Sequence, residues 1–168
     1  MRLISAAASL LALTIASALA ADDDLSAQAN AAFLSANAKK PGVTSAQGIQ
    51  YRVIKSGNGK QPDRHDCATV YYKGNLINGQ VFDQTKPGIP ATFPVGGVIK
   101  GWTEALQLMK AGGKYELWVP PELAYDVESP PSIPPGSLLV FEVELLGVKP
   151  TTPPPTGPHP VPAPAAPK

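Results

Sequence analysis

The chain has 168 residues, a length that suggests one domain with appendages. Hydrophobic side chains make up 43% of it, which is enough to form a buried core. With a formal net charge of +1, the composition gives no indication of nucleic-acid binding.

The N-terminal residues have the organisation of a secretory signal peptide. Arg2 supplies a positive charge, residues 3–19 are almost wholly apolar or small, and Ala18-Leu19-Ala20 fits the small-x-small cleavage rule. A membrane-anchoring helix is the alternative, but the apolar run is short for a membrane span. We therefore predict a signal peptide over residues 1–20, cleaved after Ala20, and a periplasmic or secreted protein.

Residues 21–42 are predicted to form an N-terminal helical arm. The aspartates at 22–24 complement the positive end of this helix, Lys39 and Lys40 complement its negative end, and Pro41-Gly42 ends it. Its apolar content is mostly alanine, so it buries little against the rest of the chain. We expect an arm or a modest dimer contact, and hence a monomer or a weak dimer.

Residues 43–149 are predicted to form the folded domain. Several segments alternate apolar and polar side chains as strands do. The turn signals Gly57-Asn58-Gly59 and Asn78-Gly79 separate some of these segments. The expected strands cover 49–54, 66–72, 81–82, 92–95, 114–119 and 138–148.

One helix is expected inside the domain. Trp102, Ala105, Leu106 and Met109 follow helical spacing, and Ala111-Gly112-Gly113 is expected to end this helix. Several strands and one helix predict an α+β fold, in which an antiparallel β-sheet wraps around one short α-helix.

Residues 150–168 are predicted to form a disordered, proline-rich tail. Nine of these 19 residues are proline, mixed with Thr, Ala and Gly. Such a composition cannot bury a core and favours an extended polyproline-II chain. A solvated tail is the simplest interpretation, and a spacer, a wall-spanning arm and an adaptor ligand are the alternatives.

The sequence does not show the residue patterns that nucleophilic catalysis, metal binding or phosphate binding would need. Cys67, the single cysteine, lies in a predicted strand without an activating neighbour, and we expect it to be inert. The only histidines, His65 and His159, are too few for a His/Cys metal site or a credible Ser-His-Asp triad. Gly96-Gly97 lacks the spacing and ending of a phosphate loop. An enzyme built from this chain would need no cofactor, no metal and no nucleophile.

Aromatic residues that are far apart in sequence lie in short, distinctive contexts. The motifs are Val70-x-Tyr72-x-Gly74, Gly79-x-x-Phe82-Asp83, Val98-Ile99-Lys100-Gly101-Trp102, Pro121-Glu122-Leu123-Ala124-Tyr125 and Leu139-x-Phe141-x-Val143-x-Leu145. Over residues 43–149 they closely resemble the FKBP-type peptidyl-prolyl cis-trans isomerases. Residues 33–51 resemble the secreted bacterial branch of that family, which includes Mip and FkpA.

The resemblance implies an FKBP-like fold in which these aromatic side chains surround a pocket for proline. Trp102 would form its floor, and its walls would be Tyr72, Phe82 and Phe141. The backbone N–H of Ile99 and the hydroxyl of Tyr125 would hold substrate carbonyl groups, with Asp83 at the pocket edge. The implied catalytic residues are Tyr72, Asp83 and Tyr125, and the implied substrate-binding residues are Phe82, Phe93, Val98, Ile99, Trp102, Ile133 and Phe141.

An apolar pocket of this kind suits a reaction that twists a bond. Resonance gives the peptide bond a rotation barrier of about 18–20 kcal/mol. The planar amide is more dipolar than the twisted transition state, so an apolar pocket penalises the planar form more. We therefore predict a peptidyl-prolyl cis-trans isomerase that assists the folding of exported proteins.

The expected partners are unfolded or proline-containing polypeptides, with macrolides as candidate inhibitors. Two other functions stay open. One is a periplasmic holdase chaperone, which binds unfolded clients at the pocket and its flanking loops. The other is a wall- or adhesion-associated binding protein with weak catalysis, in which the proline-rich tail carries the function.

Overall fold

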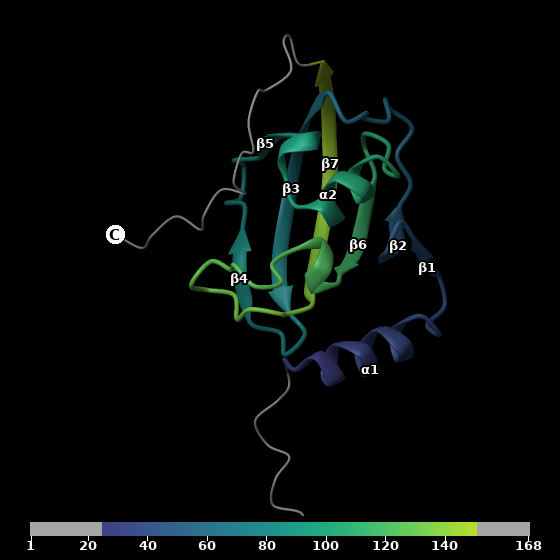
Figure 1. The fold of residues 1–168 in the computed structure, drawn as a ribbon. Coiled ribbons are helices and arrows are strands. Elements are labelled where there is room, and N and C mark those ends of the chain that lie inside the picture. The colour runs from purple at the N-terminus through teal and green to yellow at the C-terminus, as the bar shows by residue number, and fades with distance from the viewer. Residues whose placement is uncertain (1–24, 151–168) are drawn as a thin grey trace, which may run out of the picture.

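The computed structural model describes residues 25–150, which form a twisted sheet with a short helix across one face and a second helix at one end (Figure 1). The predicted signal peptide, and the predicted tail from residue 151 onward, lie outside the described residues. The elements are α1 (Ala27–Asn37), β1 (Val43–Ala46), β2 (Ile49–Lys55), β3 (Asp66–Leu76), β4 (Val81–Gln84), β5 (Ala91–Pro94), η1 (Val95–Gly97), α2 (Lys100–Leu106), β6 (Lys114–Val119), η2 (Pro121–Leu123) and β7 (Leu139–Pro150).

The strands of the described region belong to one antiparallel sheet. Its order is β1-β2-β6-β7-β3-β4, and β5 pairs separately with β3. The last strand of the described region, β7, therefore lies in the middle of the sheet, between β6 and β3. Figure 1 shows α2 in front of these central strands. The predicted α+β fold, with an antiparallel sheet around a short helix, is confirmed.

Buried and exposed side chains alternate along the strands, and α2 covers the buried face that results. In β7, Phe141 and Val143 are buried while Glu142 between them is exposed, because successive side chains point to opposite faces of a strand. The core cluster includes Ile49, Val70, Leu117, Val119, Leu139, Val143 and Leu145 from the strands and Trp102, Ala105 and Leu106 from α2.

Helix α2 is shorter than the sequence predicts. The spacing favours a helix that continues through Met109 and ends at Gly112, but α2 ends at Leu106. Beyond it the backbone turns more tightly, with Met109 N–H bonded to the Leu106 carbonyl at 3.1 Å. Gly112 N–H then bonds to the Leu145 carbonyl at 2.7 Å, which draws the chain out of the helix and toward β6. Met109 is nevertheless fully buried. Its place in the apolar pattern therefore reflects its burial in the core and not a longer helix.

Helix α1 lies inside the predicted arm but starts and ends differently. Its N-cap is Ser26, whose hydroxyl accepts a hydrogen bond from the Ala29 N–H at 3.1 Å. The aspartates at 22–24, expected to complement its positive end, lie outside the described residues. The helix ends at Asn37, and tight turns continue to Gly42, whose φ of +79° favours glycine.

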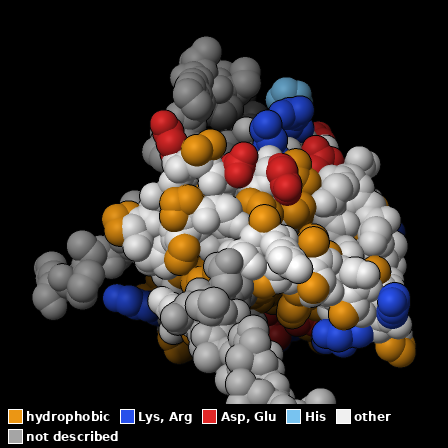
Figure 2. Space-filling view, turned by 60° about the horizontal axis from the view of Figure 1, so that its bottom comes forward, with side chains coloured by type: hydrophobic (Ala, Val, Ile, Leu, Met, Phe, Trp, Pro, Cys, Tyr) orange, Lys and Arg blue, Asp and Glu red, His pale blue; other side chains and the backbone are white. Residues whose placement is uncertain are grey.

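Exposed apolar side chains and charges of both signs share the molecular surface. Figure 2, turned so that the α1 end comes forward, shows hydrophobic side chains scattered over that face and charged ones toward its edges. The most exposed large hydrophobic side chains are Val127 at 83% and Ile89 at 63%. Neither α-helix within residues 25–150 has the length and hydrophobicity needed to cross a membrane.

Candidate functional site

An apolar hollow opens between α2, the strands and the loop that follows η2. Its empty space, including solvent at the mouth, is about 370 Å³. Only three of the side chains around it carry a polar oxygen. The lining residues are Tyr72, Phe82, Asp83, Phe93, Val98, Ile99, Trp102, Tyr125 and Phe141.

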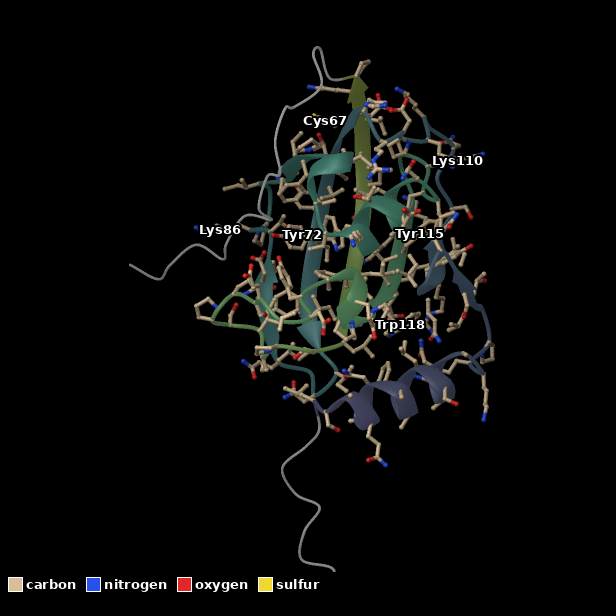
Figure 3. The ribbon with its side chains drawn as sticks, in the orientation of Figure 1. Cys67, Tyr72, Lys86, Lys110, Tyr115 and Trp118 are labelled. Carbon is tan, nitrogen blue, oxygen red and sulfur yellow. The ribbon has the colours of Figure 1, made fainter. Side chains whose placement is uncertain are left out.

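Six separate segments bring these side chains together. Tyr72 comes from β3, where it lies between β4 and α2 (Figure 3). The long β3 is paired with β4, β5 and β7, so the side chains of all four strands reach one hollow. The turn before α2, its first residues and the loop after η2 complete the wall.

The Trp102 indole forms the centre of an aromatic cluster. Its ring centroid lies 5.2 Å from that of Tyr72, 5.3 Å from that of Phe141 and 5.9 Å from that of Phe93. All three pairs meet at interplanar angles of 81° to 90°, the edge-to-face arrangement that aromatic quadrupoles favour. Phe82 meets Phe141 in the same way, at 5.6 Å and 89°. The cluster therefore holds the walls rigidly around the indole.

Two glycines allow the aromatic rings and helix α2 to pack closely against the sheet. A Cβ on Gly74 would lie 2.6 Å from the Phe82 ring and 2.9 Å from the Phe141 ring. A Cβ on Gly101 would lie 2.3 Å from Val119, where α2 crosses β6. Real Cβ atoms do not approach other atoms this closely. Gly74 thus leaves room for two walls of the hollow, and Gly101 lets the helix that carries Trp102 descend onto the sheet.

Tyr72 and Asp83 form the polar wall of the hollow. The Tyr72 hydroxyl donates a hydrogen bond of 2.5 Å to Oδ2 of Asp83. Burial, together with this hydrogen bond and the nearby negative charge, raises the pKa of Tyr72 far above its ordinary value. Its backbone N–H is bonded to the Thr85 hydroxyl at 3.1 Å. Tyr72 therefore stays protonated and fixes the Asp83 carboxylate in place.

Tyr125 is the second phenol of the hollow. Burial, and to a lesser degree the charge of Asp83, raises the pKa of Tyr125 to about 12. Its hydroxyl makes no hydrogen bond to another side chain or backbone group within residues 25–150. A protonated hydroxyl at the mouth of an apolar hollow is a donor available to a bound ligand.

Ile133 differs from the other residues that the resemblance implies. Nine of those ten line the hollow, whereas Ile133 does not and is only 4% exposed in the core cluster. Thr85 and Gly74 are not among the residues predicted for the site, although Gly74 stands in one of the sequence motifs. Their contributions depend on contacts across the sheet, for which a single sequence carries no signal.

Other reactive groups lie apart from the hollow. Cys67, in β3, is partly buried and forms no disulfide. Among the described residues, no group of three or more His, Cys, Asp or Glu side chains is arranged to hold a metal ion. The hollow itself offers a ligand aromatic surfaces, one fixed carboxylate and one available phenol.

Comparisons with known proteins agree with this arrangement. The family model for FKBP-type peptidyl-prolyl cis-trans isomerases matches residues 58–146. The peptidyl-prolyl cis-trans isomerase Mip of Coxiella burnetii is 52% identical over 126 residues, which cover 73% of this chain and 55% of that protein. The outer membrane protein MIP of Legionella longbeachae is 52% identical over 121 residues, covering 70% of this chain and 52% of the relative.

A solved structure of a similar protein has a similar fold. The peptidyl-prolyl cis-trans isomerase of Pseudomonas syringae superimposes with a TM-score of 0.69 at 38% identity, over 73% of this chain and 92% of that one. The chain spans about half the length of the curated relatives that it matches. Sequence, fold and the aromatic hollow agree, and the chain belongs to the family of FKBP-type peptidyl-prolyl cis-trans isomerases.

Proposed function

We propose that the chain catalyses the cis–trans isomerisation of peptide bonds that precede proline. The observation that carries this proposal is the hollow, whose lining side chains are aromatic or aliphatic and carry oxygen atoms only on Tyr72, Asp83 and Tyr125. A proline ring is a compact apolar group that such a surface can hold. The family membership supports the same reaction.

Desolvation of the amide would lower the barrier to rotation. Water stabilises the dipolar planar amide, and the twisted transition state has lost this resonance and its polarity. Transfer into the hollow therefore costs the planar state more than the twisted state. A reduction of the barrier by about 5 kcal/mol would accelerate the reaction a few thousandfold.

Two donors are placed to hold the substrate while the bond rotates. The Tyr125 hydroxyl is one, because it is protonated and makes no hydrogen bond to the described residues. The backbone N–H of Ile99 is the other. The Ile99 carbonyl accepts hydrogen bonds from Trp102 N–H at 3.0 Å and Thr103 N–H at 3.1 Å, which holds the backbone of Ile99 at the start of α2. In this mechanism Trp102 is the floor, Tyr72 orients Asp83, and no covalent bond forms or breaks.

The experiment is an isomerisation assay on a short Xaa-Pro peptide. We expect the purified chain to accelerate cis-to-trans conversion, measured by protease-coupled cleavage or by NMR exchange. An uncatalysed rate in the presence of folded protein would refute the proposed activity.

Adjacent tyrosines of β3 provide a matched pair of variants. Tyr72→Phe removes the hydroxyl that holds Asp83, whereas Tyr71→Phe makes the same change on the opposite face of the strand. We expect lower kcat/KM for Tyr72→Phe and unchanged kcat/KM for Tyr71→Phe. Equal activity in both variants would remove Tyr72 from the proposed site.

The proposal extends to export and to inhibitors. The signal-peptide pattern of residues 1–20, and the outer-membrane name of one relative, support a periplasmic or secreted location. N-terminal sequencing of the exported protein should find Ala21 as its first residue. A macrolide inhibitor would compete with the peptide, since both would occupy the same aromatic hollow.

A holdase chaperone is a second candidate, and exposed apolar loop residues favour it. In sequence, Val127 is two residues from Tyr125, and Ile89 lies between the lining residues Asp83 and Phe93. Both would meet an unfolded client that is longer than the hollow. If this function operates, suppression of client aggregation should persist in Tyr72→Phe and fall in a Val127→Ser/Ile89→Ser double variant.

A further inference from the structure

A buried amide side chain fastens α1 to the loop that follows η2. Asn30 lies near the start of an alanine-rich helix, yet it is only 4% exposed. Its Nδ2 donates to the Gly136 carbonyl at 2.7 Å, and its Oδ1 accepts from the Leu138 N–H at 3.3 Å. The side chain thus satisfies a donor and an acceptor of a backbone segment more than a hundred residues away.

The segment that Asn30 holds is bonded directly to Tyr125. Gly136 N–H donates to the Tyr125 carbonyl at 3.2 Å. The φ of Gly136 is +74°, a conformation that favours glycine, and its two flanking peptides form both of these hydrogen bonds. The amide of Asn30 and the backbone of Tyr125 are therefore joined through one residue.

The other hydrogen bonds of this loop are local. The Ser129 hydroxyl bonds to the Ile133 carbonyl, and the Ser137 hydroxyl bonds to the Pro134 carbonyl. These contacts shape the loop but do not attach it to another element. Asn30 supplies a contact from outside the loop, and it acts close to the residue that carries the available phenol.

We propose that Asn30 is a positioning residue for Tyr125, so that helix α1 is part of the machinery that orients the substrate. The inference rests on the proposed isomerase activity for its kinetic consequence, although the structural link can be measured without it. Loss of the Asn30 side chain would leave the Gly136 carbonyl and the Leu138 N–H without their partner and loosen the Tyr125 backbone.

Asn37 provides a matched control on the same helix. It is the other buried residue of α1, and its Nδ2 donates to the Gln50 side chain in β2 at 3.0 Å. Asn37→Ala and Asn30→Ala thus remove the same atoms from the same helix. Of the two, only Asn30 is hydrogen-bonded to the loop of Tyr125.

The first measurement is amide hydrogen exchange without substrate. In Asn30→Ala, we expect the Gly136 N–H, which is bonded to Tyr125 and not to Asn30, to exchange about tenfold faster than in the unaltered chain. Asn37→Ala should leave this rate unchanged. Equal Gly136 exchange in the unaltered chain and in Asn30→Ala would overturn the link. If Asn30→Ala does not fold, Asn30→Ser gives the same test with a smaller polar side chain.

The second measurement is a double-mutant cycle on kcat/KM. Asn30→Ala should lower kcat/KM about three- to tenfold, because small displacements of a positioned group cost rate. In a Tyr125→Ala background, which lacks the phenol and its ring, the same change should cost less than about twofold. Asn37→Ala should have little effect in either background. An equal loss from Asn30→Ala in both backgrounds would show a role independent of Tyr125 and would overturn the proposal.

The two measurements separate this inference from the proposed function. An inactive parent chain would refute the isomerase activity, and the exchange of Gly136 would then decide the structural link alone. An active parent chain with unchanged Gly136 exchange in Asn30→Ala would refute the positioning role and leave the activity intact.

Discussion

The Tyr72 hydroxyl and the Asp83 carboxylate, eleven residues apart on the paired strands β3 and β4, are joined by a 2.5 Å hydrogen bond at the wall of the hollow. This pairing distinguishes the two phenols that line the hollow. Tyr72 donates its proton to Asp83, while the Tyr125 hydroxyl has no such partner among residues 25–150.

Replacement of Asp83 should lower activity without unfolding the domain. Asp83→Asn keeps the shape of the side chain and removes the charge that Tyr72 holds. We expect kcat/KM to fall about tenfold, which corresponds to about 1.4 kcal/mol of transition-state stabilisation. Asp126→Asn, an exposed neighbour of Tyr125, is the control and should retain full activity. Full activity in Asp83→Asn would show that the carboxylate has no role in the reaction.

Replacing each of the two tryptophans should distinguish an effect on peptide binding from an effect on stability. Trp102 is 5% exposed at the floor of the hollow, and Trp118 is 3% exposed beside a different hollow that faces α1. Replacement of either by Leu should reduce the free energy of unfolding by about 2–4 kcal/mol. Only Trp102→Leu should raise KM for a proline peptide. A similar KM in both variants would contradict the floor assigned to Trp102.

Gly74 should tolerate no side chain. The Cβ of Gly74→Ala would press against the Phe82 and Phe141 rings at 2.6 Å and 2.9 Å. We expect a loss of about 1–3 kcal/mol in the free energy of unfolding, with displaced walls and reduced peptide binding. Gly147→Ala, on the adjacent strand β7, has open space at this position and should change stability by less than about 0.5 kcal/mol. Denaturant melts and peptide titrations of the two variants provide the comparison.

Alkaline pH should weaken the fold through its buried phenols. Burial raises the pKa of Tyr125 to about 12, and burial with the Asp83 hydrogen bond raises that of Tyr72 further. In the unfolded chain both phenols lose their protons near pH 10, while the folded chain keeps them. The stabilisation is therefore complete below about pH 10 and is lost as the pH rises toward the folded pKa values.

Denaturant unfolding at several pH values between about 8.5 and 11.5 measures this effect. Tyr125→Phe removes one of the phenols whose pKa is raised, so the free energy of unfolding should decline less steeply with pH. An identical slope in the parent chain and in Tyr125→Phe would contradict the raised pKa of Tyr125.

Much of the sheet and of the hollow is predictable from the sequence because both depend on local patterns. Strand β6 begins and ends at the residues that alternation predicts, and the family resemblance implies all nine lining residues. Strand β1 was not predicted, since Val43–Ala46 is short and only partly buried. The predicted end of α2 was wrong because hydrogen bonds from Leu145 and other distant residues decide where the helix stops.

The docking of α1 could not be predicted, for a different reason. Hydrophobic periodicity finds helices that bury apolar stripes, but α1 buries Asn30 and Asn37. Polar residues in an alanine-rich helix indicate solvent exposure unless the partners are known. These partners, Gly136, Leu138 and Gln50, come from elsewhere in the chain and leave no local signal.

The central position of β7 has a consequence for the order in which the protein is made. β1, β2 and β6 form one part of the sheet and β3, β4 and β5 the other, and β7 alone pairs with both. The strand that joins them ends at Pro150 and is synthesised after the other strands of the described region. A nascent chain that has not yet reached these residues cannot close its sheet or surround Trp102 with its walls. The domain must therefore remain incomplete until nearly its whole length has emerged from the ribosome.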